Sequence, residues 1–301
     1  MRLRLLLALA PLVLLLCAAC GSAKGGGAAP THVLFAAGDL VGCHSPGAEE
    51  TFKLVPKQPR ALVATLGDHV YQTGSPALYR GCYARTWGRI AGRDRPTPGD
   101  HDYVEPNAPG YFGYFHRVLE RFGPTAAKWG YYSYDLGTWH VVVLNSNCGS
   151  IGGCDATSAE GRWLSADLAR HPARCTLAYW HFPLFNSGFE GNRTEGAFFW
   201  QALYESGAEI VLDGHNHAYE RFALQTPDGE PDPRGIREFV VGTGGRSHYL
   251  FSKGKLQPNS QVRNDTSFGV LRLKLRPGSY SWKFLPAGGG TFTDAGTGNC
   301  H

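Results

Sequence analysis

The chain has little charge of either sign. Of its 301 residues 18% are charged, and 29 basic against 25 acidic side chains give a net charge of +4. Arg2 and Arg4 lie in a leader that we expect to be removed, and subtracting them leaves 27 basic residues and a net charge of +2. A balance this close to neutral lacks the basic excess of a nucleic-acid-binding surface, so we expect no nucleic-acid partner.

The chain also lacks an internal repeat, and its N-terminal apolar run is too short to span a membrane comfortably. That run follows a basic start and ends in small residues, which is typical of a secretory signal. Ala18 and Ala19 directly before Cys20 resemble a bacterial lipoprotein cleavage box, with Cys17 where leucine is usual. We expect Cys20 to become a lipidated first residue that tethers the protein to the membrane, with plain secretion as the alternative.

These features divide the chain into three parts. Residues 1–19 are the expected export signal, and residues 20–30, rich in glycine, alanine and serine, are the expected flexible tether. Residues 31–301 are the expected folded domain, and the 43% of hydrophobic residues in the chain is an ordinary globular composition. We therefore expect an exported protein, either a cell-surface lipoprotein or a secreted one.

Beyond the leader no Cys-x-x-Cys pair is present, which argues against a cysteine metal site. Six cysteines remain, and an even number in an exported chain favours three disulfides over metal binding. The spacing alone does not choose among the possible connectivities. The pairs that we favour are Cys43–Cys82, Cys148–Cys154 and Cys175–Cys300.

Segments with strand and helix patterns alternate along the domain, which predicts an α/β fold. The expected strands cover residues 33–37, 61–66, 139–144, 176–180, 209–212, 239–241, 270–275 and 280–285. The expected helices cover residues 48–55, 76–90, 111–122, 157–170 and 195–206. Thr157, Ser158, Ala159 and Glu160 form a capping box for the fourth helix.

Side chains that can bind metals stand directly after several of these strands, where open α/β sheets bind their ligands. Asp39 and Asp68 follow the first two expected strands in Gly-Asp steps, and Asp100 stands in a third Gly-Asp step after the Pro-rich entry Pro96-Thr97-Pro98. His181 follows a further strand, and His215 and His217 follow the strand at 209–212. Alternate side chains of an extended segment point the same way, so the last two histidines can reach one site. Neutral imidazole is a ligand for zinc, iron and other transition metals.

Five segments resemble, in order, the metal-binding blocks of the calcineurin-like metallophosphoesterases. They are Gly38-Asp39, Gly67-Asp68-His69-Val70-Tyr71, Gly99-Asp100-His101-Asp102, Trp180-His181-Phe182-Pro183 and Gly214-His215-Asn216-His217-Ala218-Tyr219-Glu220-Arg221. Two positions favour the purple acid phosphatases: Val41 stands where the general family has histidine, and Tyr71 lies three residues after Asp68. The resemblance spans about residues 31–285 and implies a four-layer α/β/β/α sandwich with the metal site at the carboxyl ends of the strands.

The resemblance further implies two metal ions that share one ligand. One would be held by Asp39, Asp68, Tyr71 and His217, and the other by Asp68, Asp100, His181 and His215. Phenolate and carboxylate oxygens suit ferric iron, whereas two imidazoles suit a divalent iron, zinc or manganese ion. The implied reaction is hydrolysis of phosphate monoesters, on a small-molecule or protein substrate, by attack of metal-bound hydroxide.

His101 is not needed as a ligand, so it is free to hydrogen-bond the phosphoryl group or to protonate the leaving oxygen, with Asp102 as an orienting partner. Simpler roles stay open for several residues. Asp39 could cap a loop, Tyr71 could be a core tyrosine, and His101 could be structural.

Outside the blocks, Arg246 lies in a Gly-rich loop and contacts either the substrate phosphate or only solvent. His69 and His140 fill no ligand position, and we expect them to be surface or packing residues.

One block departs from the family pattern, because Asp100 stands where the family has a neutral asparagine ligand. We expect this extra carboxylate to shift the pH optimum toward neutral or alkaline values and to hold the second metal more tightly. Alternatively, Asp100 turns away from the site or has silenced the enzyme. Two other functions stay open, a phosphodiesterase acting on nucleotides or lipids and a catalytically weak, metal-binding surface lipoprotein.

Overall fold

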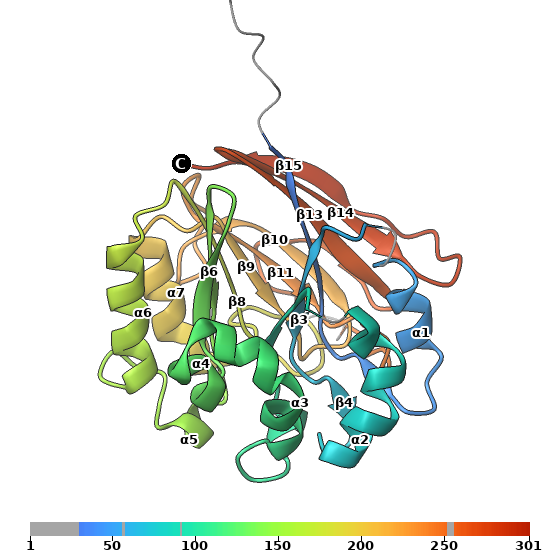
Figure 1. Ribbon diagram of the computed structural model, residues 1–301. Coiled ribbons are helices and arrows are strands. Elements are labelled where there is room, and N and C mark those ends of the chain that lie inside the picture. The colour runs from blue at the N-terminus through green and yellow to red at the C-terminus, as the bar shows by residue number, and fades with distance from the viewer. Residues whose placement is uncertain (1–29, 56–57, 91, 252–255) are drawn as a thin grey trace, which may run out of the picture.

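The computed structural model describes residues 30–55, 58–90, 92–251 and 256–301. The expected export signal and residues 20–29 of the expected tether lie outside these ranges, so both stay predictions. None of the helices in the described part of the chain has the length and apolar character needed to cross a membrane. The domain is an α/β structure in which two β-sheets pack between helices (Figure 1).

The first sheet has six strands in the order β15-β14-β13-β1-β3-β5. They are β1 (His32–Ala37), β3 (Leu62–Leu66), β5 (Asp94–Thr97), β13 (Gly269–Arg276), β14 (Ser279–Pro286) and β15 (Ala295–Asn299). Strands β1, β3 and β5 run parallel, with Leu34 opposite Leu62 and Val63 opposite Asp94, and β13 pairs with β1 in the antiparallel sense. The carboxyl ends of β1, β3 and β5 therefore meet at one edge of the sheet.

The second sheet has seven strands in the order β12-β10-β11-β9-β8-β7-β6. They are β6 (Tyr132–Leu136), β7 (Trp139–Val143), β8 (Cys175–Tyr179), β9 (Ile210–Asp213), β10 (Tyr219–Gln225), β11 (Ile236–Val241) and β12 (Ser260–Asn264). Strands β7, β8, β9 and β11 run parallel, so the ends of β8 and β9 lie side by side. A short parallel pair, β2 (Val41–Gly42) and β4 (Val70–Tyr71), stands apart from both sheets.

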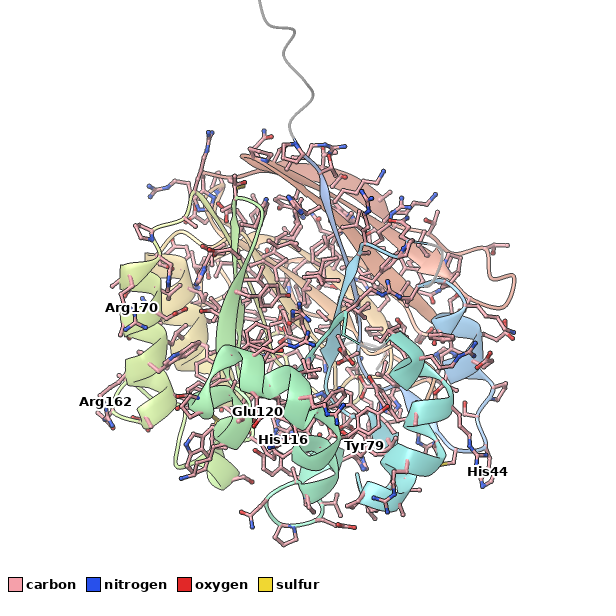
Figure 2. The ribbon with its side chains drawn as sticks, in the orientation of Figure 1. His44, Tyr79, His116, Glu120, Arg162 and Arg170 are labelled. Carbon is pink, nitrogen blue, oxygen red and sulfur yellow. A yellow bond between two sulfur atoms is a disulfide. The ribbon has the colours of Figure 1, made fainter. Side chains whose placement is uncertain are left out.

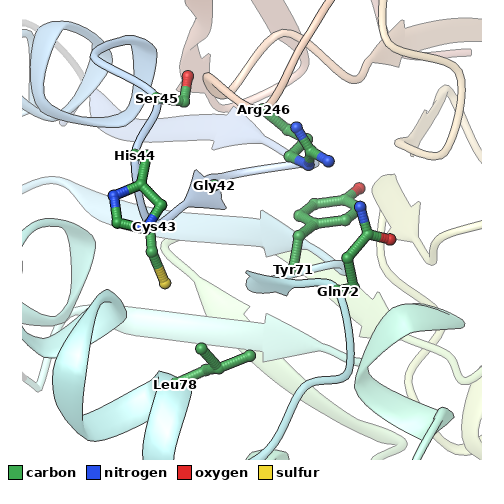
Figure 3. A pocket seen from close by; sticks show the side chains of 8 residues that line it. All are labelled: Gly42, Cys43, His44, Ser45, Tyr71, Gln72, Leu78 and Arg246. Carbon is green, nitrogen blue, oxygen red and sulfur yellow. The ribbon is translucent and has the colours of Figure 1, made fainter.

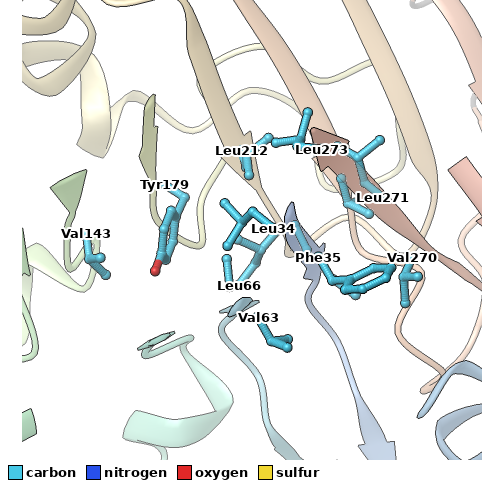
Figure 4. Close-up of a cluster of buried hydrophobic side chains, with 14 of the residues drawn as sticks. Leu34, Phe35, Val63, Leu66, Val143, Tyr179, Leu212, Val270, Leu271 and Leu273 are labelled. Carbon is cyan, nitrogen blue, oxygen red and sulfur yellow. The ribbon is translucent and has the colours of Figure 1, made fainter. Parts of the chain in front are cut away.

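The two sheets pack against each other through one layer of apolar side chains (Figure 4). Leu34 and Leu66 of the first sheet and Tyr179 and Leu212 of the second are fully buried there. Burying one such leucine contributes about 2 kcal/mol. This layer holds the two sets of strand ends in a fixed relation to each other.

Helices flank both sheets. On the second sheet lie α6 (Ala159–Arg170) and α7 (Ala197–Glu205), which share a separate apolar cluster with it through Leu164, Trp200 and Val211. Arg162 and Arg170 on α6 are exposed and point away from the body (Figure 2). The remaining helices are α1 (Gly47–Phe52), α2 (Pro76–Gly81), α3 (Pro109–Leu119), α4 (Pro124–Trp129) and α5 (Cys148–Ile151). This order of layers fits the predicted α/β/β/α sandwich.

The predicted helix over residues 76–90 is shorter than expected. Helix α2 ends at Gly81, and the chain continues as two 3-10 helices, Tyr83–Arg85 and Trp87–Ile90. Glycine is a poor helix former, and the next residue, Cys82, is bound to Cys43, so the α-helix stops at this point.

The predicted capping box of α6 forms only in part. The Ser158 hydroxyl accepts a hydrogen bond from the Gly161 amide at 3.0 Å, as a helix cap does. Glu160 does not reach back to the cap. Its carboxylate is buried and accepts from the Asn145 amide at 2.7 Å, which ties the helix to the loop after β7.

All three favoured disulfides are confirmed. They are Cys43–Cys82, Cys148–Cys154 and Cys175–Cys300. Disulfides persist in oxidising compartments, so three of them fit an extracellular protein.

A buried histidine joins the second sheet to α6. The His140 Nε2 atom lies 3.0 Å from Asp167 Oδ2, and its Nδ1 atom lies 3.1 Å from Asp135 Oδ1. Burial alone would lower the pKa of His140, but these two carboxylates raise it above its ordinary value. Against the effect of burial, His140 in turn lowers the pKa of Asp167, which also accepts from Ser133 at 3.0 Å.

We predict that His140→Gln lowers the melting temperature mainly at mildly acidic pH. A histidine with a raised folded-state pKa stabilises fully below its unfolded pKa of about 6.5, and the effect fades as pH rises through the folded pKa. Losing one partner of this buried pair should cost roughly 2–3 kcal/mol, or about 5–10 °C for a domain of this size. Thermal melts at pH 6 and pH 9 measure the difference.

The control is His116→Gln, because His116 faces Glu120 on the exposed surface of α3 at 3.3 Å. An exposed pair of this kind contributes about 0–1 kcal/mol. A His140 variant that loses as much stability at pH 9 as at pH 6 would contradict the charged-pair interpretation.

Candidate metal centre

The predicted ligands all lie at the carboxyl ends of strands. Asp39, Asp68 and Asp100 follow β1, β3 and β5 of the first sheet, His181, His215 and His217 follow β8 and β9 of the second, and Tyr71 ends β4. Because the strands are parallel and the sheets are packed face to face, these side chains converge on one place. They form two donor groups, which we call the tyrosine group and the histidine group.

The tyrosine group is centred on the phenol of Tyr71. Its hydroxyl oxygen lies 2.8 Å from Asp39 Oδ1, 2.7 Å from Asp68 Oδ2 and 3.1 Å from His217 Nε2. His217 Nε2 also lies 3.2 Å from Asp39 Oδ1. Tyr71 is therefore not an ordinary core tyrosine, since its hydroxyl group meets two carboxylates and an imidazole.

The histidine group is centred on the carboxylate of Asp100. Its Oδ1 atom lies 3.0 Å from His181 Nε2 and 3.3 Å from His215 Nδ1. His181 Nε2 lies 3.5 Å from Asp68 Oδ1, so Asp68 contacts both groups. Asp100 faces these histidines and does not turn away from the site.

Three of the predicted ligands have a strained backbone. Asp39, Asp68 and His215 have φ values of 59°, 52° and 66°, a left-handed conformation that side chains other than glycine seldom adopt. Such residues persist only where the surrounding structure holds them, and they cluster at functional sites. The glycine before Asp68 allows the close packing, because a Cβ atom on Gly67 would lie 2.5 Å from His181 Nδ1.

Two of the predicted ligand histidines are oriented by partners behind them. His181 Nδ1 donates to the carbonyl oxygen of Leu66 at 2.8 Å, and His217 Nδ1 is hydrogen-bonded to the hydroxyl group of Ser247 at 2.7 Å. The Tyr249 ring stacks on His217 with centroids 3.9 Å apart. In both histidines Nε2 is thereby turned toward the carboxylates, as outer partners of metal-binding histidines commonly do.

The shifted pKa values of the site indicate that these side chains are arranged to bind cations. Burial and the neighbouring carboxylates of Asp39 and Asp100 raise the pKa of Asp68 to about 7, in spite of His181. Burial would lower the pKa of His181, but Asp68 and Asp100 raise it to about 10. Burial, Asp39 and Asp68 raise the pKa of Tyr71 well above its ordinary value. Without cations these groups retain protons that bound metal would displace.

The donor set supports two metal ions. Asp39 Oδ2 is buried and has no hydrogen-bond partner among the described residues, which leaves this oxygen available to bind a metal ion. Carboxylate and imidazole atoms of Asp100, His181 and His215 lie within 4.8 Å of one another, as do those of Asp39, Asp68 and His181. Carboxylates, a phenol and imidazoles are the ligands that iron, zinc and manganese take in proteins.

Of the two predicted catalytic residues, His101 lies beside the site. Its ring packs against Tyr71 at a tilt of 50° with centroids 4.3 Å apart, and its Nδ1 atom donates to the Gln72 carbonyl oxygen at 2.6 Å. The His101 amide donates to Asp68 Oδ1 at 2.9 Å. The imidazole is thus fixed at the rim, next to the donor atoms.

The prediction that Asp102 orients His101 is wrong. Asp102 is fully buried, and its Oδ2 atom lies 2.9 Å from Nδ1 of His69, a histidine expected only to pack. It also accepts from the Tyr79 hydroxyl at 2.7 Å and from the Gly99 amide at 2.9 Å. The turn after Asp100 directs the Asp102 carboxylate into the core, where its hydrogen bond with Gly99 supports the loop that carries Asp100.

Some neighbours of the site were not predicted. Arg193 Nη1 lies 3.1 Å from His215 Nε2, and its guanidinium is 4.0 Å from the Phe182 ring centroid. Ser247 and Tyr249 follow β11 in the second sheet, so the rule that ligands gather at strand ends could have found them. No local pattern marks Arg193, because it lies in a long loop between β8 and α7.

The fold matches that of a solved purple acid phosphatase, as the predicted resemblance implies. Purple acid phosphatase PPD1 from yellow lupin (Lupinus luteus) seeds superposes with a TM-score of 0.71 at 16% identity, covering 89% of this chain and 54% of that one. GAP50, the anchor in the inner membrane complex of Plasmodium, superposes with a TM-score of 0.67 at 14% identity, covering 90% and 89% of the two chains.

Sequence similarity points to the same group. Purple acid phosphatases 22 and 18 of Arabidopsis thaliana are each 34% identical to the chain, over 164 and 153 residues. These regions cover 50% and 48% of this chain but 36% and 34% of the relatives, so the chain matches about a third of their length. No protein family model matches the chain. The predicted resemblance to the purple acid phosphatases is confirmed.

We predict that loading the metal-free protein at pH 7 releases protons. With folded pKa values of about 10 for His181 and about 7 for Asp68, and a higher one for Tyr71, these groups hold about two protons or more at that pH. The apparent metal affinity should therefore rise between pH 7 and pH 10. Titration calorimetry in buffers of different ionisation enthalpy counts the protons.

Tyr71→Phe is the matched variant, because it keeps the ring and removes the titrating hydroxyl group. It should release about one proton fewer per chain than the unmodified protein. Equal proton release by the two proteins would mean that the phenol does not bind metal.

Proposed function

We propose that this protein is an exported, metal-dependent phosphatase that hydrolyses phosphate monoesters at a centre of two metal ions. The observation that carries the proposal is the pair of donor groups joined by Asp68, which lies 2.7 Å from the Tyr71 hydroxyl and 3.5 Å from His181. The confirmed fold and the similarity to purple acid phosphatases support the reaction class. The substrate in this proposal is a phosphorylated small molecule or protein.

The residues have separate tasks in this proposal. Asp39, Tyr71 and His217 hold one ion, Asp100, His181 and His215 hold the other, and Asp68 reaches both. Two such ions supply positive charge that holds phosphoryl oxygens and acidifies a water molecule. The Nδ1–H group of His101 already donates to the Gln72 carbonyl oxygen at 2.6 Å, so only Nε2 can act on the substrate. In its doubly protonated form His101 donates from Nε2, as a proton to the leaving oxygen or as a hydrogen bond to the phosphoryl group.

The donor chemistry favours ferric iron in the tyrosine group and a divalent iron, zinc or manganese ion in the histidine group. Two carboxylates and a phenolate supply three negative charges to the first ion, which suits a trivalent cation. The Tyr71→Phe variant tests this choice as well. Oxidised protein with iron on the phenolate has a visible charge-transfer band that the variant lacks, and a colourless iron-loaded protein contradicts it.

We keep a non-catalytic alternative because GAP50, which is described as an anchor, has the same fold. Fold alone therefore does not make this protein an enzyme. The two alternatives are a phosphodiesterase acting on nucleotides or lipids and a catalytically weak metal-binding surface lipoprotein. The proposed membrane tether through Cys20 is compatible with all three, and membrane retention of a Cys20→Ser variant would contradict it.

One assay separates the three functions. Purified protein is given 4-nitrophenyl phosphate and bis(4-nitrophenyl) phosphate, and its metal content is measured in the same sample. We expect faster hydrolysis of the monoester, and a loss of more than about a hundredfold in His217→Ala, beyond the effect of losing an outer partner. Preference for the diester favours the phosphodiesterase, and bound metal without hydrolysis favours the surface lipoprotein.

Asp100 gives a prediction of its own, because it adds a negative charge where the family has asparagine. A less positive centre attracts phosphate less and acidifies water less. We therefore expect Asp100→Asn to move the pH optimum of hydrolysis downward and to bind inorganic phosphate more tightly. The variant should also lose its second metal more readily.

The measurements are pH-rate profiles of the unmodified protein and the Asn variant at saturating metal, and phosphate inhibition at one pH. The control is Asp135→Asn. The Asp135 carboxylate is 71% exposed and contacts His140, which is not one of the proposed ligands. An unchanged profile, or a shift to higher pH in Asp100→Asn, would show that the carboxylate does not tune the centre.

A further inference from the structure

A pocket of about 450 Å³ opens beside the tyrosine group (Figure 3). Tyr71 forms one wall, and His44 and Arg246 enter from two separate loops. This volume is typical of a small-molecule site and exceeds what one phosphate group needs. The pocket is therefore suited to the part of a substrate that lies beyond the reacting phosphate.

Arg246 is held in a fixed position against the metal-binding residues. Its guanidinium carbon lies 4.9 Å from the centroid of the Tyr71 ring, and its backbone amide donates to the Asp39 carbonyl oxygen at 3.0 Å. The neighbouring Gly244 amide donates to Gly38 in the same way at 2.9 Å. Two backbone hydrogen bonds thus tie the loop of Arg246 to the loop of a proposed ligand.

The pocket walls are joined to one another. The Ser45 hydroxyl donates to the Gly245 carbonyl oxygen at 2.6 Å, and the Cys43–Cys82 disulfide holds the adjoining loop. Gly42 leaves room for the arginine, because a Cβ atom there would lie 3.2 Å from Arg246 Cδ. A site built in this way needs little reorganisation when it binds a ligand.

Within the part of the chain that the structure describes, the guanidinium of Arg246 has no protein counter-charge. Among the described residues, no carboxylate lies within 4.0 Å of it, whereas Arg193 and Arg221 are paired with Glu195 and Asp294. Its Nε atom is buried and has no hydrogen-bond partner in the same set of residues. A half-buried cation left unpaired is costly, so its position at the pocket wall points to an anionic ligand.

We propose that Arg246 binds a second phosphate group, carried by the leaving group of the substrate. This inference rests on the proposed phosphatase function and names its substrate class, phosphate esters or anhydrides whose leaving group is itself phosphorylated. The planar guanidinium can donate two parallel hydrogen bonds to a phosphate. A lysine would present only a point charge there.

The leaving group faces this pocket because of His101. The proposed proton donor is hydrogen-bonded to the backbone of Gln72, and Gln72 lines the same pocket. In the reaction a water molecule loses a proton to solvent and its oxygen bonds to the reacting phosphorus. The bond between phosphorus and the leaving oxygen breaks, His101 gives the leaving oxygen a proton, and His101 is then reprotonated from solvent. The phosphorylated leaving group then lies on the side of Arg246.

Two substrates that share one nucleoside test the proposal. Adenosine monophosphate loses an uncharged leaving group, whereas the terminal phosphate of adenosine diphosphate leaves from a phosphorylated one. We expect Arg246→Ala to lower kcat/KM for the diphosphate by about tenfold to a hundredfold and to change it little for the monophosphate. Arg246→Lys should recover part of the loss, and Arg117→Ala, an exposed arginine on α3, should change neither value.

A binding measurement without metal makes the result independent of hydrolysis. Metal-free protein is titrated with adenosine monophosphate, whose single phosphate should bind at Arg246, and with adenosine, which should not bind. Arg246→Ala should weaken binding of the monophosphate about tenfold or more.

The outcomes are distinct. Equal losses for both substrates, or unchanged binding of the monophosphate by Arg246→Ala, would overturn the proposal and leave Arg246 as a residue that only positions Tyr71. Arg246-dependent binding without hydrolysis of any ester would support the anion site and contradict the proposed phosphatase function.

Discussion

The carboxylate of Asp68 joins two groups of donors, and each group draws side chains from both sheets. It lies 2.7 Å from the Tyr71 hydroxyl on one side and 3.5 Å from His181 on the other. Tyr71 ends β4, shortly after β3 of the first sheet, whereas His181 stands at the end of β8 in the second sheet. The donors can meet only if the carboxyl ends of both sheets converge, and the buried layer between Leu34 and Leu212 holds them so.

Bringing these groups together is energetically costly for the protein alone. Two like charges about 4 Å apart repel by roughly 4 kcal/mol at an effective dielectric constant of 20, and three carboxylates gather here. Asp39, Asp68 and His215 add strained backbone conformations that cost about 1–3 kcal/mol each. Protons or cations must offset the repulsion, so the raised pKa values of Asp68 and His181 and the proposed metal binding have the same cause.

Much of the site follows from the sequence because parallel strands place their carboxyl ends at one edge. Asp39, Asp68 and His181 each stand one step beyond an apolar run, so their convergence needs only the α/β pattern. Hydrophobic periodicity alone does not assign the ligands. The resemblance to a known family supplied the order of the blocks and the role of Tyr71. The disulfide pairs were a choice among many, and all three are present.

What the sequence did not predict depends on tertiary contacts. Strand β5 (Asp94–Thr97) contains Pro96 and is too short for a clear pattern, yet it pairs with β3 along its whole length. Strand β15 (Ala295–Asn299) is glycine-rich and exposed, and it pairs with β14 next to the disulfide of Cys300. Asp102 turns toward His69, which is close in space but 33 residues away in the chain. Local spacing carries no signal for such a contact.

The most direct test of this account is the metal content of purified protein and of two variants, measured by elemental analysis per mole of chain. We predict two ions in the unmodified protein, one in His215→Ala, and a loss of both in Asp68→Asn, because Asp68 alone among the described residues contacts both donor groups. A single ion in the unmodified protein, or two ions retained without the Asp68 carboxylate, would contradict a shared centre.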